Sequence, residues 1–182
     1  MRNIIKIIML SVCMMAILCS CKNEQKTETA ETKDVVYEEI NKAPQITFPE
    51  QTILAVAVVP NEMEVTFAQK YFPNGGYDDM KTIDTGKEMR FVVISKDENV
   101  KFSVFPCDIN DEGEVVKSEA AYIENYSGCL KINAMEVEYI PHVCIVYESN
   151  GIEKMLPLTF EGQEGHIDLS GNENDVIDIS IY

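Results

Sequence analysis

From Pro44 onward the sequence consists of short apolar runs separated by turn residues, and the sharpest of these turns is Asn150-Gly151. Runs rich in β-forming residues flank it on both sides, at residues 142–149 and 152–160. Both turn residues tolerate the positive φ that a two-residue connection demands, so the pair predicts a tight antiparallel hairpin. Apolar runs that recur every 10 to 15 residues or so, with turns between them, are typical of strands and not of helices.

The other expected elements follow from the same kind of pattern. Residues 52–59 are continuously apolar, which indicates a strand covered on both faces. Residues 62–71 alternate between apolar and polar side chains and are assigned to a strand, with a helix over residues 65–72 as the competing assignment. Residues 118–128 favour one helical turn, with Ser118 as its N-cap and Gly128 at its end. Further strands are expected at residues 88–95, 100–107, 129–135, 137–139, 166–169 and 176–182.

The expected strands number about eight to ten and leave little helix, so we predict an all-β fold. The architecture that fits best is an antiparallel, immunoglobulin-like β-sandwich over residues 44–182, with a small β-barrel as the alternative. About 140 residues suffice for one domain with its own core. The chain has no tryptophan and therefore lacks the Cys…Trp…Cys spacing of true immunoglobulin domains, so the prediction concerns architecture and not ancestry.

The N-terminal segment has the order of a signal peptide. Arg2 and Lys6 precede residues 7–18, which carry no charge. A permanent transmembrane helix is disfavoured, because it would need about 20 apolar residues. The segment ends in Leu18-Cys19-Ser20-Cys21, with an aliphatic residue, then a small one, then a cysteine at the positions around a cleavage site.

This ending resembles the lipobox of bacterial lipoproteins. The resemblance implies that residues 1–20 are removed and that the Cys21 thiol takes up the lipid. At about 0.8 kcal/mol per buried methylene, two or three acyl chains hold such a protein in a bilayer essentially irreversibly. The chain also resembles the small lipoproteins of the Bacteroidetes group, and Lys22 with Glu24 is similar to part of their surface-export signal. We therefore expect a lipid-anchored protein of the cell envelope, at the outer membrane, facing the periplasm or the cell surface.

Residues 21–43 are expected to be a flexible tether, because they hold too little apolar surface to offset their ordering entropy. The formal net charge of the whole chain is −16, and it becomes −18 once the two positive charges of Arg2 and Lys6 are removed. Nucleic-acid binding requires clustered Lys and Arg that replace counterions. The charge therefore excludes nucleic acid as a partner and favours solubility.

Three cysteines remain in the domain, namely Cys107, Cys129 and Cys144. One disulfide with one free thiol, or three buried thiols, are both compatible with the sequence. No pair has the close spacing of a zinc or redox motif, and buried apolar cysteine is the preferred interpretation.

Residues 108–119 match an EF-hand-like calcium loop in part. The ligands would be oxygens of Asp108, Asn110, Glu112 and Glu119, with Gly113 at the sharp turn. Glu112 is long for its position, and the loop follows an expected strand instead of a helix. The alternative is an acidic hairpin turn without a cofactor, and calcium is the only cofactor that the sequence suggests.

A second candidate site is aromatic. Tyr71, Phe72 and Tyr77 surround the turn at residues 73–76, where exposed rings would suit a sugar or a peptide. The alternative is that these rings fold back onto the edge of the core. His166 with Asp168, and His142, are interpreted as ordinary surface residues, because no nucleophile motif accompanies them.

Two classes of function follow. The first is a non-catalytic binding or scaffold module, held by lipid at Cys21, with a protein or glycan partner. The second is an accessory subunit of an envelope enzyme or secretion machine, or a calcium-binding domain. We expect no catalytic residues, because the common nucleotide, hydrolase and metalloprotease motifs are absent from the sequence.

Overall fold

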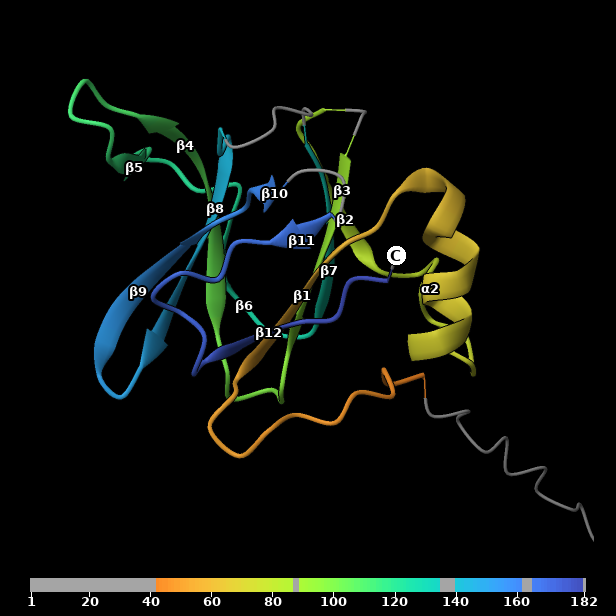
Figure 1. Ribbon diagram of the computed structural model, residues 1–182. Helices are drawn as coiled ribbons and strands as arrows, with labels where there is room; N and C mark the ends of the chain where they lie inside the picture. The colour runs from red at the N-terminus through yellow and green to blue at the C-terminus, as the bar shows by residue number, and fades with distance from the viewer. Residues whose placement is uncertain (1–41, 87–88, 135–139, 162–164, 182) are drawn as a thin grey trace, which may run out of the picture. The chain divides into compact units, whose positions relative to one another are not determined.

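The computed structural model describes residues 42–86, 89–134, 140–161 and 165–181. Several expected features lie outside these ranges: the signal peptide with Leu18, Cys19 and Ser20, the lipidation site at Cys21, most of the tether, and the strand at residues 137–139. Within them the fold is all-β apart from one short helix and one helical turn (Figure 1). No helix of this described part has the length and apolar character needed to cross a membrane.

The first sheet consists of β1 (Leu54–Val58), β2 (Lys81–Asp84), β3 (Met89–Ser95), β7 (Cys129–Ala134) and β12 (Val176–Asp178). Their spatial order is β12-β1-β3-β7-β2. The pairs β1–β3 and β3–β7 are antiparallel, whereas β1–β12 and β2–β7 are parallel. The prediction of a purely antiparallel arrangement is therefore wrong for two pairs, because side-chain alternation reports the faces of a strand and not the direction of its neighbour.

The second sheet consists of β4 (Phe102–Ile109), β5 (Val115–Lys117), β6 (Ile123–Tyr126), β8 (Val143–Ser149) and β9 (Ile152–Pro157). The order is β5-β4-β8-β9, and β6 also pairs with β4, all of them antiparallel. Asn150 and Gly151 join β8 to β9 with φ values of 54° and 76°, so the predicted hairpin is confirmed. A small separate pair is formed by β10 (Phe160–Glu161) and β11 (His166–Ile167).

The main core lies between the two sheets. Leu54, Val56 and Val58 of β1 point into it and are fully buried, together with residues of β3, β7, β4, β8 and β9. The opposite face of β1 presents Ala55 and Ala57, which are also fully buried, beneath the helix. The prediction of a strand covered on both faces is confirmed.

The segment at residues 61–71 is helical, so its assignment to a strand is wrong and the competing assignment is right. A 3-10 turn, η1 (Asn61–Met63), leads into α2 (Glu64–Tyr71), which covers the outer face of the first sheet (Figure 1). The alternation is misleading because Val65 is 67% exposed, while Phe67 is fully buried. Burying a ring of this kind contributes about 1.5–3 kcal/mol, enough to override a local pattern.

Two further segments differ in detail from expectation. The helical turn expected at residues 118–128 is absent from the described residues there, and the strand β6 occupies residues 123–126 instead. The C-terminal segment pairs formally with β1 only over β12, yet it continues beside it: Ile179 N–H donates to Val56 O (2.8 Å), and Val58 N–H donates to Ser180 Oγ (2.9 Å).

A polar hollow at the loop end of the domain

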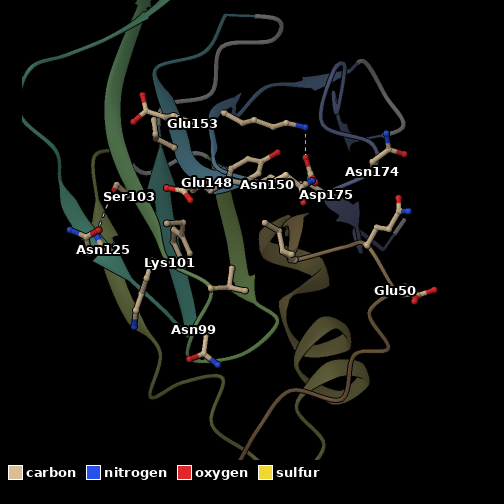
Figure 2. Close-up of a pocket in the computed structure, with 18 residues that line it drawn as sticks. Glu50, Asn99, Lys101, Ser103, Asn125, Glu148, Asn150, Glu153, Asn174 and Asp175 are labelled. Atoms are coloured by element: carbon tan, nitrogen blue, oxygen red, sulfur yellow. Dashed lines mark hydrogen bonds and ion pairs between the residues drawn. The ribbon is translucent and has the colours of Figure 1, made fainter.

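A hollow of about 970 Å³ opens at the end of the domain where the β3–β4 turn and the β8–β9 hairpin lie (Figure 2). Asn99 comes from the first connection and Asn150 from the second. Glu50, before β1, and Asn174, before β12, lie on the opposite side of the hollow in the view. With Asn125 of β6, five segments that are distant in the sequence meet around one cavity.

The lining is dominated by polar side chains. It has four carboxylates against two ammonium groups, so its formal charge is negative. The lining side chains that carry charge or can hydrogen-bond are Glu50, Gln51, Asn99, Lys101, Ser103, Asn125, Tyr147, Glu148, Ser149, Asn150, Glu153, Lys154, Asn174 and Asp175. A surface of this kind suits a hydroxyl-, amide- or ammonium-bearing ligand better than an apolar one.

Asp175 is the most buried charge of the hollow, with a side chain only 6% exposed. Lys154 Nζ forms an ion pair with its Oδ2, and Ser149 Oγ donates to its Oδ1 (2.6 Å). Burial alone would raise the pKa of this carboxyl, but the hydrogen bonds from Lys154 and Ser149 outweigh it and lower the pKa below its ordinary value. The Asp175 backbone carbonyl also accepts the N–H of Leu54 (3.1 Å), so this residue ties the start of β1 to the wall of the hollow.

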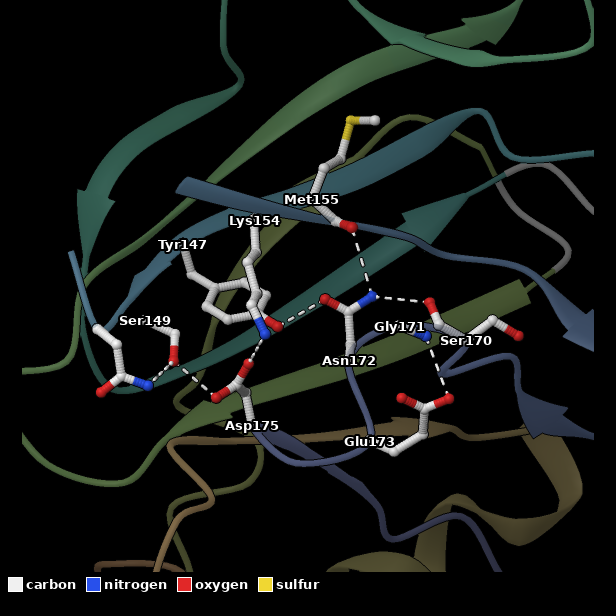
Figure 3. Close-up of polar contacts among 10 residues, drawn as sticks. Tyr147, Ser149, Lys154, Met155, Ser170, Gly171, Asn172, Glu173 and Asp175 are labelled. Atoms are coloured by element: carbon white, nitrogen blue, oxygen red, sulfur yellow. Dashed lines mark hydrogen bonds and ion pairs between the residues drawn. The ribbon is translucent and has the colours of Figure 1, made fainter. Parts of the chain in front are cut away.

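Asn172 extends the network into the interior (Figure 3). Its Oδ1 accepts a hydrogen bond from Tyr147 Oη (2.6 Å), and its Nδ2 donates to Ser170 O (3.2 Å) and Met155 O (3.4 Å). Burial raises the pKa of Tyr147, and the nearby Asp175 raises it further, so this hydroxyl stays a donor at neutral pH. The loop at residues 170–175 is thereby fastened to β8 and β9.

Asn125 lies on the wall of the hollow opposite Asp175. This residue has φ of 51°, a left-handed conformation that Asn tolerates better than most residues, where the pairing of β6 with β4 shifts register. Its backbone N–H donates to Ser103 Oγ (3.1 Å), and nearby Lys101 Nζ donates to Ser127 Oγ (3.0 Å). Both walls are therefore fixed by hydrogen bonds.

The residues suggested for calcium lie at the opposite end of β4, in the β4–β5 connection. Asn110 Oδ1 accepts the backbone N–H groups of Glu112 (3.0 Å) and Glu114 (2.8 Å), while Asp108 Oδ1 accepts that of Ile109 (2.8 Å). Glu119 lies beyond β5. Among the described residues no three His, Cys, Asp or Glu side chains converge as a metal site, and calcium stays a prediction.

The three aromatic candidates lie at the helix-covered face of the first sheet and do not line the hollow. Phe72 and Tyr77 are 4% and 3% exposed, with ring centroids 5.7 Å apart, and both pack on Phe67. Tyr71 is half-buried at the end of α2. The structure thus places two of the rings in the core, which is the alternative arrangement, and leaves them no open face for stacking on a ligand.

His166 pairs with a different acid from the one that the sequence suggests. Its Nδ1 lies 2.9 Å from Asp178 Oδ2, which also accepts the Ile167 N–H (3.1 Å). Asp168 instead accepts hydrogen bonds from Ser170.

The segment at residues 170–175 lies between the strands expected at residues 166–169 and 176–182, and sequence reasoning missed Asn172 and Asp175 in it. Their only sequence signal is position: they immediately precede an apolar strand in a turn, where polar residues are common. The chain matches no protein-family model, no curated protein and no solved structure. The function is therefore argued from the geometry of the hollow.

Proposed function

We propose that this protein is a lipid-anchored lipoprotein of the bacterial cell envelope whose domain is a non-catalytic binding module. The lipobox-like Leu18-Cys19-Ser20-Cys21 supports the anchor, with the acylated Cys21 in the bilayer of the outer membrane. The hollow at the loop end supports the binding role. A protein segment or a glycan is the partner that we propose for it.

We further propose that the domain is an immunoglobulin-like sandwich. The order β1-β3-β7 in one sheet and β5-β4-β8-β9 in the other corresponds to strands A-B-E and C′-C-F-G of that architecture. β2 and β12 have no counterpart in this correspondence: β2 precedes β3 in the chain and runs parallel to β7, unlike strand D, and β12 runs parallel to β1. Both are additions at the edges of the first sheet.

The single observation that carries the binding proposal is the position of the hollow. Under the same correspondence the β3–β4 turn and the β8–β9 hairpin are the B–C and F–G loops. In variable domains these loops form the ligand-contacting end of the sandwich. Asn99 and Asn150 bring polar groups from these two loops to one cavity of about 970 Å³.

Asp175, the most buried carboxylate of the hollow, suits a fixed charge and not a general acid. Its pKa is lowered by the hydrogen bonds from Lys154 and Ser149, whereas a general acid at neutral pH needs a raised pKa.

The decisive experiment is site-specific photo-crosslinking of the full-length protein in its own envelope. A photoreactive residue replaces Asn99 in the hollow or, as the matched control, the exposed Asp111 in the β4–β5 turn. We expect a discrete protein or glycan adduct from position 99 and little from position 111. Equal adducts from both positions would contradict a binding site at the hollow.

The anchor is tested separately with Cys21→Ser. This variant should lose acyl labelling and should no longer sediment with membranes, because the nucleophile that takes the lipid is gone. Retained lipidation would contradict the lipoprotein assignment and would leave the crosslinking result untouched.

A further inference from the structure

Two of the three domain cysteines lie together on one face of the second sheet. Phe105 of β4 pairs with Cys144 of β8, and the Cys107 N–H donates to His142 O (3.0 Å). Cys107 and Cys144 therefore occupy diagonal positions on the same face of two hydrogen-bonded strands. Cys129 lies on β7, in the other sheet.

The two side chains also share one apolar cluster with Phe105 and Val146. Cys107 is 7% exposed and Cys144 is fully buried. The contact between the two sulfurs raises the pKa of the Cys107 thiol. Of the two, Cys107 is the one with exposed surface through which an external disulfide can reach it.

We propose that Cys107 and Cys144 are a redox-active dithiol that closes to a disulfide across β4 and β8, while Cys129 stays a free thiol. Diagonal Cα atoms lie about 7–8 Å apart in an antiparallel pair, and a disulfide spans about 4.4–6.8 Å. Closing the bond therefore requires a local backbone shift that shortens this diagonal by about 1–2 Å. Cys107 lies just beyond the last β4–β8 pair, Pro106 with Val143, and its other neighbour is Lys117 of β5.

The oxidant is a second disulfide, either that of an envelope dithiol oxidoreductase or that of oxidised glutathione. The Cys107 thiolate attacks it, forms a mixed disulfide and releases one thiol of the oxidant. The second cysteine of the pair then displaces the other half. The Cys107–Cys144 pair loses two electrons and two protons, and the oxidant is reduced to two thiols. The occurrence of this reaction in the cell rests on the proposed envelope location, because such compartments are oxidising.

The test uses the full-length protein in detergent, reduced and then equilibrated with glutathione buffers of increasing oxidised fraction. The sequence makes the result unambiguous, since trypsin places the three cysteines in three peptides, at residues 102–117, 118–131 and 132–154. After alkylation under denaturing conditions we expect peptides 102–117 and 132–154 to be linked, with peptide 118–131 alkylated. A link to peptide 118–131, or alkylation of all three peptides at every buffer composition, would overturn the proposal.

Cysteine variants distinguish the effect of the Cys107–Cys144 disulfide from other effects of oxidation. Cys129→Ser should keep the linked pair, and Cys107→Ser or Cys144→Ala should abolish it. Oxidation should raise the Tm of the wild type and of Cys129→Ser by several degrees, and it should leave Cys107→Ser unchanged. An equal rise in Cys107→Ser would count against the bond even if Cys144→Ala does not fold.

In a second experiment, cells are quenched with acid, their free thiols are alkylated, and the same tryptic peptides are analysed. The linked peptides in cells would support both the dithiol and the envelope location. Linked peptides with glutathione but three free thiols in cells would overturn the location and leave the dithiol chemistry standing.

Discussion

The turn at residues 108–114 and the loop at residues 170–175 are both short and acidic, and each contains an Asn that accepts hydrogen bonds, yet they are held in opposite ways. In the first, Asn110 Oδ1 caps backbone N–H groups within four residues, and most of the side chains are exposed. In the second, Asn172 and Asp175 are buried and bind residues 17 to 26 positions away. The first loop stabilises itself, whereas the second joins strands and forms the wall of the hollow.

This difference predicts unequal costs for the same substitution. Asp175→Ala leaves Lys154 without its buried partner, and we expect a loss of about 2–3 kcal/mol in the free energy of unfolding. Asp111→Ala in the exposed turn should change it by no more than about 0.5 kcal/mol. Urea unfolding of the full-length protein at pH 7 measures both. Similar values for the two variants would remove the distinction between the loops.

Of the two loops, only the buried one at residues 170–175 should make stability depend on pH, through Asp175. The folded-state pKa of Asp175 lies below the ordinary value of 3.8, so its contribution to stability is complete above that pH and is lost as the pH falls through the lowered pKa. The stability difference between wild type and Asp175→Asn should therefore be constant near neutral pH and shrink below about pH 4. Urea midpoints between pH 7 and pH 2.5 test this. A difference that stays constant to the lowest pH would mean that the Asp175 charge adds nothing to folding.

Features whose cause lies within a single element could be predicted from the sequence. Asn150-Gly151 predicts its hairpin because the requirement is local: two adjacent residues must adopt positive φ. The two-sided burial of residues 52–59 is likewise visible in an unbroken apolar run. In both cases the information lies within the element itself.

The features that sequence reasoning missed depend on partners far along the chain. Phe67 lies in a helix because it has the sheet beneath it, and a short alternation cannot report that. Asp175 lines the binding hollow because the β8–β9 hairpin places Ser149 and Lys154 beside its carboxylate, and the sequence near Asp175 does not show these distant partners. The hollow is lined by five separate segments, so no single motif could have indicated it.

The smallest expected effect belongs to the exposed turn. Asn110→Ala removes the oxygen that accepts the N–H groups of Glu112 and Glu114, and we expect a loss of about 1 kcal/mol, because water can replace part of this bonding. Calcium should raise the Tm of neither the wild type nor this variant, since Asn110 Oδ1 already serves the backbone. Calorimetric titration with calcium measures this directly. If the wild type releases heat on binding calcium and Asn110→Ala does not, the turn at residues 108–114 is an ion site. The two acidic loops would then differ in that one binds calcium and the other binds only residues of the same chain.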